Sequence, residues 1–218
     1  MTEKLYLAHP EMRTANAKIV ALVAAADGRP AVRLDRTIFH AQGGGQKADR
    51  GRIGDARVLH VAHNGGDIDH IIDSPELLEV GSVVRAEVDD AWRRLNAVYH
   101  TAGHLIASVV ERMFPGVKAV SGHQWPGEGR VEFEGPVPVE TKADIEAALY
   151  QAIAEGLPVK IQGNPYEDRS IGIGNMTAIA CGGTHVENLS AIASIQIRSI
   201  NAKKGKIRIS YEAIAADE

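Results

Sequence analysis

The sequence predicts an α+β protein, in which a small N-terminal β-barrel is followed by an α+β domain with helices on a mostly antiparallel sheet. Three observations support this fold class. Short apolar or alternating runs fill the first 90 or so residues, helical apolar spacing begins after Asp89-Asp90, and strand-like runs flank a second helical pattern. Strands followed by a mixture of helices and strands are typical of α+β proteins.

Turn-forming residues separate the strand-like runs of the first region. They occur at Asp27-Gly28, Gly43–Gly45, Asn64-Gly65-Gly66, Ser74-Pro75 and Gly81. Many short strands with regular turn signals indicate a small barrel or sandwich. Val58–Ile72, with Asn64-Gly65-Gly66 at its centre, is typical of a hairpin. The expected strands are Lys4–Ala8, Ala17–Ala24, Ala31–Leu34, Ala56–Val61, Asp67–Ile72 and Ser82–Val88.

Two helices are expected in the second region. The first covers Ala91–Met113, with Asp90 as its N-cap and Pro115-Gly116 after its end. The second covers Ala143–Glu155, with Thr141 as its N-cap. The expected strands are Lys118–Gly122, Arg130–Glu134, Val159–Gln162, Thr177–Ala180, Ala193–Ser199 and Lys206–Glu212. The change of pattern predicts one domain over residues 1–90 and another over 91–218.

The composition limits the class of protein. Cys181 is the one cysteine among 218 residues, so an intramolecular disulfide is impossible and a reducing compartment is favoured. The first residues lack the pattern of a signal peptide, and no apolar run approaches the roughly 18 residues of a transmembrane helix. We therefore expect a cytoplasmic protein without a membrane partner.

A nucleic-acid partner would require a local basic patch, because the formal net charge is −4. Basic residues that could contribute are Arg93, Arg94, Lys203, Lys204, Lys206 and Arg208. Each of these charges is also explained by an ordinary solvated surface.

Two short motifs together predict a metal site. His100 and His104 are four residues apart on the first expected helix, so both imidazoles lie on one face. Cys181 and His185 enclose two glycines, which allow a tight loop. Three imidazoles and one thiolate suit tetrahedral zinc, and we expect one Zn²⁺ per chain.

The role of that metal is open at this point. Thr101 occupies the position where a zincin peptidase has its glutamate general base, so a zincin is not expected. Four protein ligands are typical of a closed structural site, whereas a catalytic site keeps one position open. The metal could also position a substrate without activating water.

A glycine-rich segment, TIFHAQGGGQKADRG, occupies residues Thr37–Gly51. It lacks the ending of a P-loop. A hairpin with a bulge explains it, and so does an active-site loop with dense polar neighbours. In the second case His40 could transfer a proton, and Gln46 could hold a sugar hydroxyl or an amino group.

The segments TIFHAQGGGQKADRG, HTAGHL and CGGTH resemble, in order and spacing, the editing domain of alanyl-tRNA synthetase and the freestanding AlaX trans-editing proteins. The resemblance covers nearly the whole chain. It implies a β-barrel followed by the second additional domain shared by threonyl- and alanyl-tRNA synthetases. It also implies hydrolysis of the ester in Ser-tRNA(Ala), with Gly-tRNA(Ala) as a further substrate.

The resemblance also implies roles for individual residues. His100, His104, Cys181 and His185 match the zinc ligands, and Thr37 matches a threonine linked to the serine hydroxyl. We expect Thr37, His40 and Gln46 to take part in catalysis. The residues expected to bind substrate are Gly43, Gly44, Gly45, Gly182, Gly183 and Thr184.

Three hypotheses about function follow. The first is a zinc-dependent aminoacyl-tRNA deacylase that recognises the acceptor end of tRNA(Ala). An alanine pocket rejects glycine or serine poorly by binding alone, so a second hydrolytic site is a physical remedy. The second is a zinc metallohydrolase of a small ester or amide. The third is a non-catalytic, zinc-stapled module that binds tRNA or a synthetase. Separately, His123 could line a tRNA groove or be a loop residue, and Trp125 could stack on a terminal base or belong to the core or a hairpin. The oligomeric state is not predicted.

Overall fold

The computed structural model describes residues 1–138, 141–203 and 205–217. The chain divides into two compact units. The N-terminal unit comprises Met1–Gly43 and Lys47–Arg93, and the C-terminal unit comprises Gly44–Gln46 and Arg94–Glu218. The break between Arg93 and Arg94 lies close to the expected boundary at residue 90. The sequence did not predict that Gly44–Gln46 would group with the C-terminal unit.

Six antiparallel strands of the N-terminal unit close into a barrel, in the order β2-β3-β7-β6-β5-β8. The alternating strand residues send Ile19, Leu34 and Val61 into a fully buried core. The strand bounds are β2 Thr14–Ala24, β3 Pro30–Leu34, β5 Gly51–Ile53, β6 Ala56–Asn64, β7 Asp67–Ile72 and β8 Val83–Val88.

The expected strand at Lys4–Ala8 is wrong. Strand β1 covers Glu3–Lys4, where it pairs in parallel with β4, Arg36–Thr37. Leu5–Leu7 then form a 3₁₀ turn that buries Tyr6. Strand β1 pairs over two residues, so β4 offers no partner that would extend it through Ala8.

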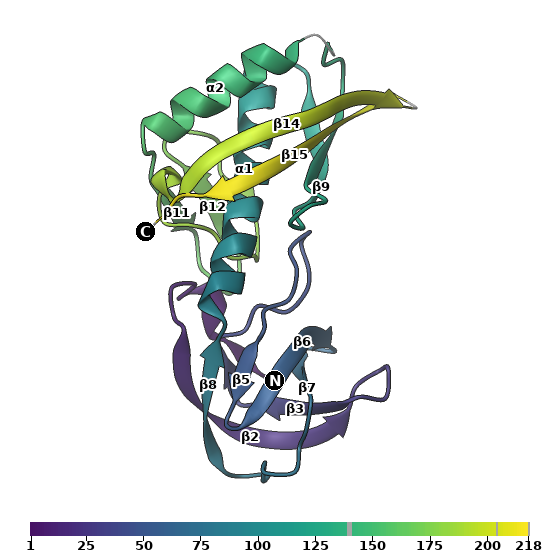
Figure 1. Ribbon diagram of the computed structural model, residues 1–218, viewed down its shortest axis with the longest axis vertical. Coiled ribbons are helices and arrows are strands. Elements are labelled where there is room, and N and C mark those ends of the chain that lie inside the picture. The colour runs from purple at the N-terminus through teal and green to yellow at the C-terminus, as the bar shows by residue number, and fades with distance from the viewer. Residues whose placement is uncertain (139–140, 204, 218) are drawn as a thin grey trace. The chain divides into compact units, whose positions relative to one another are not determined.

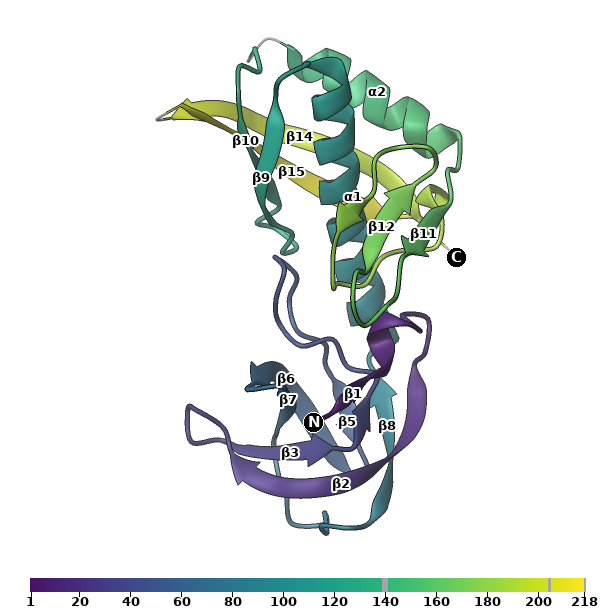
Figure 2. The ribbon, with the colours of Figure 1, turned by 180° about the vertical axis from the view of Figure 1, so that it is seen from behind.

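The described residues of the C-terminal unit form two α-helices and two antiparallel sheets (Figures 1 and 2). The larger sheet has the order β14-β15-β10-β9, and the smaller has the order β11-β12-β13. The α+β class with mostly antiparallel sheets is therefore confirmed. The bounds are α1 Asp90–Met113, β9 Lys118–His123, β10 Arg130–Glu134, α2 Lys142–Ala154, β11 Val159–Gln162, β12 Ser170–Ile173, β13 Ile179–Ala180, β14 Ile192–Lys203 and β15 Lys206–Ala215.

Helix α1 crosses one face of the larger sheet (Figures 1 and 2). Val98, Leu105 and Val109 are fully buried along it, in one core with Ile209 and Tyr211 of β15. Residues 96–107 are buried on every side of the helix. Any functional side chain in this stretch therefore points into the protein interior and not toward bulk water.

The expected helix caps need correction. The Asp89 carboxylate, and not that of Asp90, accepts a hydrogen bond from the Trp92 N–H at 3.0 Å. Asp90 is the first residue of α1 and forms an ion pair with Arg13. Thr141 precedes α2 as expected, but its hydroxyl donates to the Pro138 carbonyl and does not cap the helix.

Most of the basic residues considered for a nucleic-acid patch have protein partners. Arg93 is 1% exposed and forms an ion pair with the buried carboxylate of Asp49. Arg208 lies 2.7 Å from Glu132. Arg94 donates to the Ala216 carbonyl, and Lys206 lies 3.9 Å from Glu134. Lys204 and the side chain of Lys203 are outside the described residues.

Among the described residues, no helix is long and apolar enough to span a bilayer.

Candidate metal centre

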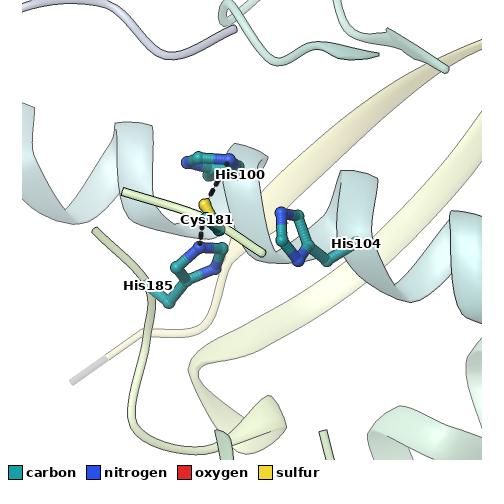
Figure 3. A group of neighbouring side chains, drawn as sticks. All are labelled: His100, His104, Cys181 and His185. Carbon is teal, nitrogen blue, oxygen red and sulfur yellow. Dashed lines mark hydrogen bonds between the residues drawn. The ribbon is translucent and has the colours of Figure 1, made fainter. Parts of the chain in front are cut away.

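Four side chains of the C-terminal unit converge on one point (Figure 3). His100 and His104 project from α1, and Cys181 and His185 come from the loop after β13. Their four ligand atoms all lie within 4.8 Å of one another. The two motifs that are separated in sequence therefore form one cluster, which can hold a metal ion.

The glycines around the cluster permit close packing. A Cβ atom on Gly183 would overlap the His100 ring. Gly183 is therefore required by space, since its loop passes directly over a ligand. The helical spacing of His100 and His104 brings their ring centroids to 5.0 Å, and His185 lies 4.4 Å from the His100 centroid.

Two of the histidines have their outer nitrogen held by a protein partner. His100 Nδ1 lies 2.7 Å from Gln46 Oε1, and His185 Nδ1 lies 3.1 Å from Thr101 Oγ1. The opposite nitrogens, both Nε2, lie 3.4 Å and 3.3 Å from Cys181 Sγ. If each Nδ1 carries the hydrogen and donates it outward, each Nε2 has its lone pair free for a metal, which is the usual arrangement around histidine ligands.

His104, the third histidine of the cluster, also has the properties of a metal ligand. Burial, with a smaller contribution from the charge of Arg169, lowers the pKa of His104 to about 4. The ring is therefore neutral near pH 7, as a ligand must be. Its buried Nδ1 has no hydrogen-bond partner among the described residues. An unsatisfied buried nitrogen is costly unless an ion or water binds there.

The electrostatics of Cys181 also suit a cation. Burial raises the pKa of the Cys181 thiol, while the Gly183 N–H and the charge of Arg169 lower it. The Gly183 N–H lies 3.3 Å from the sulfur, and the Arg169 guanidinium donates to the Cys181 carbonyl. A bound cation would deprotonate the thiol outright. The donor set therefore fits a metal ion.

A cavity of about 360 Å³ opens beside the cluster. His100, His104 and Cys181 are on its wall, together with Gly44 and Gly182. Three of the four candidate ligands therefore border space that a small group could enter. The fourth, His185, does not line this cavity.

The tip of the glycine-rich segment belongs to the metal centre. Gln46 is fully buried; its Nε2 donates to Thr184 Oγ1 at 2.8 Å, and its Oε1 accepts the Thr184 N–H at 2.9 Å. Gly45 packs so closely that a Cβ there would lie 2.5 Å from the Gly122 carbonyl oxygen. Two of the predicted site residues, Gln46 and Thr184, thus connect the glycine-rich segment to the cluster.

The other predicted catalytic residues lie in the N-terminal unit. The Thr37 hydroxyl donates to His70 Nε2 at 2.7 Å, because His70 Nδ1 donates to the Val32 carbonyl at 2.9 Å. His40 is 3% exposed, and burial lowers its pKa to about 4. Gly43 also lies in this unit. A Cβ atom added to Gly43 would lie 3.6 Å from the His63 ring.

Several residues at the centre were not predicted. Thr101 contacts His185, Arg169 contacts the Cys181 carbonyl, and Gln124 lines the cavity. Gln124 lies so close to Gly103 that a Cβ there would overlap it, and Tyr211 donates to its Oε1. None of these residues has a spacing signal in the sequence. His123 and Trp125 lie together, with ring centroids 4.6 Å apart.

A segment of the C-terminal unit matches a known protein family. Residues 169–210 match the family described as the Threonyl and Alanyl tRNA synthetase second additional domain. This match includes Cys181 and His185 of the cluster. This part of the C-terminal unit is therefore similar to the domain shared by these synthetases.

Relatives that are similar over most of this chain are named alanyl-tRNA editing proteins. The chain is 29% identical over 214 residues to "Alanyl-tRNA editing protein AlaX-M" of Pyrococcus horikoshii, covering 96% of each protein. It is 33% identical over 195 residues to "Alanyl-tRNA editing protein Aarsd1" of Mus musculus, covering 80% of this chain and 46% of that protein. The chain thus spans about half the length of the mouse relative. The predicted resemblance to the AlaX-type alanyl-tRNA editing proteins is confirmed.

Proposed function

We propose that this protein hydrolyses the ester bond of mischarged Ser-tRNA(Ala), and that Gly-tRNA(Ala) is a further substrate. One observation carries the proposal: three of the four candidate metal ligands border a cavity of about 360 Å³, and Gln46 of the glycine-rich motif is hydrogen-bonded to one of them. The names of the relatives, which are alanyl-tRNA editing proteins, agree with this reaction.

The metal in this proposal is zinc. His100, His104, Cys181 and His185 would hold it, because three imidazoles and a thiolate are a borderline-soft set. When bound, zinc supplies a positive charge that can polarise an ester carbonyl or orient a ribose hydroxyl. Gln46 and Thr101 would keep the His100 and His185 rings in position through their Nδ1 atoms.

The remaining roles are assigned to residues of the two units. Residues 1–90 form the barrel domain and residues 91–218 the editing domain in this proposal. Thr37 recognises the serine hydroxyl and His40 accepts a proton from the attacking water. His40 is neutral near pH 7, the state that a proton acceptor needs. The substrate-binding residues of this proposal are Gly43, Gly44, Gly45, Gly182, Gly183 and Thr184.

The decisive experiment compares three charged tRNAs. The metal-loaded protein is incubated with Ser-tRNA(Ala), Gly-tRNA(Ala) and Ala-tRNA(Ala), and loss of the amino acid is followed against buffer. We expect faster loss of serine and glycine than of alanine. Loss of serine at the buffer rate would overturn the proposal.

Two further measurements separate the other hypotheses. Turnover of small free esters that is unaffected by uncharged tRNA would favour a metallohydrolase without a tRNA substrate. If the metal has only a structural role, the Cys181→Ala variant should lose both its zinc and the circular dichroism signal of the folded protein. A folded Cys181→Ala variant that has lost deacylation supports the proposed reaction.

A further inference from the structure

A second cavity, of about 420 Å³, lies in the C-terminal unit along α1. Its wall is polar and contains residues from α1, from the start of β9 and from the turn before β13. The side chains that matter here are Ser108, Glu111, Arg112, Lys118, Asn175 and Thr177. None of these residues belongs to the metal cluster.

On two segments, residues that line the second cavity are direct sequence neighbours of residues that line the metal cavity. On α1, Ala107 lines the metal cavity and Ser108 lines the second one. On β9, Ala119 lines the metal cavity and Lys118 lines the second one. Arg112 follows His104 by two turns of α1, which is about 12 Å along the axis. A nucleic-acid strand covers this distance in a few nucleotides, at about 3.4 Å each.

The charges of the second cavity favour an anion. Arg112 and Lys118 are exposed, and neither forms an ion pair with a described residue. The wall carries these two cations and one carboxylate, Glu111, whose Oε1 accepts the Ala119 N–H at 2.8 Å. This contrasts with Arg93 and Arg208, whose charges are neutralised by Asp49 and Glu132.

We propose that this second cavity binds phosphate groups of the tRNA acceptor strand, with Arg112 and Lys118 as the cations. The inference rests on the proposed function, since it takes the aminoacyl end to lie in the metal cavity. Ser108, Asn175 and Thr177 add hydroxyl and amide donors, which are common partners of phosphate oxygens. Contacts of this kind position a nucleic acid without reading its sequence.

The first test measures binding of uncharged tRNA(Ala) to the metal-loaded protein at several salt concentrations. Arg112→Gln and Lys118→Gln should each weaken binding several-fold at low salt. Each should also reduce the slope of log affinity against log salt by about 0.7, the value for one phosphate of a single strand. Lys160→Gln, an exposed lysine of β11 away from both cavities, is the matched control and should bind like the wild type.

The second test separates binding from chemistry. Arg112→Gln should raise KM for Ser-tRNA(Ala) and leave kcat unchanged, and it should leave hydrolysis of 3′-seryl-adenosine, which has no phosphates, unchanged. Arg112→Lys retains the charge and should restore binding. Wild-type affinity in both glutamine variants, or equal weakening by Lys160→Gln, would overturn the inference.

The outcomes also distinguish this inference from the proposed reaction. A wild-type protein that binds tRNA through Arg112 and Lys118 but does not release serine refutes the deacylase and retains the phosphate site. Release of serine with no effect of either glutamine variant refutes the phosphate site and retains the deacylase.

Discussion

Gln46 connects the glycine-rich motif to the candidate metal ligands through one amide group. Its Oε1 accepts from His100 Nδ1 and from the Thr184 N–H, and its Nε2 donates to the Thr184 hydroxyl. The side chain therefore determines both the orientation of a ligand and the path of the loop that contains two others. Partners of metal-bound histidines contribute strongly to metal affinity.

Replacing Gln46 by alanine should weaken metal binding by about 10- to 100-fold, because His100 would lose the acceptor that holds its ring. The measurement is competition with a zinc chelator of known affinity. Gln42→Ala is the matched control, since Gln42 belongs to the same segment and its side chain is exposed. Equal zinc affinity in the wild type and Gln46→Ala would contradict this role.

His70 makes stability depend on pH. Burial lowers its pKa from 6.5 to about 4, so the folded protein excludes a proton that the unfolded chain accepts. As pH falls from 6.5 toward 4 the unfolded state is favoured, and the loss should reach about 2 kcal/mol at pH 5. Well above pH 6.5, where neither the folded nor the unfolded state binds the proton, this residue has no further effect.

Urea unfolding at pH 7 and pH 5 tests the role of His70. A Trp125→Phe background leaves Trp92, which is in the N-terminal unit, as the fluorescent reporter. His70→Gln should be less sensitive to pH than the parent. His40, with a pKa also lowered to about 4, accounts for part of the remaining sensitivity. The same pH sensitivity in both proteins would exclude His70 as a source.

At the scale of elements, the loop Cys181–His185 depends on how closely it approaches α1. Gly183→Ala would place a methyl group into the His100 ring, and the loop or the ring would have to move. We expect loss of stoichiometric zinc with little change in secondary structure. Gly43→Ala is the control for zinc content, because its Cβ would lie at an ordinary 3.6 Å from His63. Full zinc loading of Gly183→Ala, measured by metal analysis, would refute this requirement.

The sequence predicted those elements whose signal is local. The bounds of β7, β10 and β11 agree with the expected strands residue by residue. The strands β4, β5 and β12 were missed, because each has four residues or fewer and depends on pairing with distant partners. A short pattern such as Ser170–Ile173 carries too few residues for a period to be recognised.

The same difference in range explains what was predicted of the metal centre. His100 and His104, or Cys181 and His185, are pairs within one turn or one loop, so spacing alone indicates them. Gln46 and His100 are 54 residues apart in sequence, and Thr101 and His185 are 84 apart. Only the fold brings such partners together. Their contribution to the site could therefore be known only from the structure.

At the scale of the whole molecule, the metal centre is confined to one of the two units. The four candidate ligands, Gln46, Thr101 and Arg169 all belong to the C-terminal unit. That unit also has a hydrophobic core of its own, built from α1, α2 and the larger sheet. Metal removal should therefore weaken one unit without unfolding it, in contrast to zinc fingers, which unfold without metal.

Two single-tryptophan variants test this expectation, because Trp92 reports on the N-terminal unit and Trp125 on the C-terminal unit. Chelation of zinc should lower the melting temperature seen by Trp125 by about 10 °C, if zinc is present at about 100 times its Kd. The Trp92 transition should not move, and circular dichroism at 25 °C should be retained while deacylation is lost. A chelated C-terminal unit that is already unfolded at 25 °C would instead assign the metal a purely structural role. A Trp92 transition that shifts equally would show that the two units unfold as one.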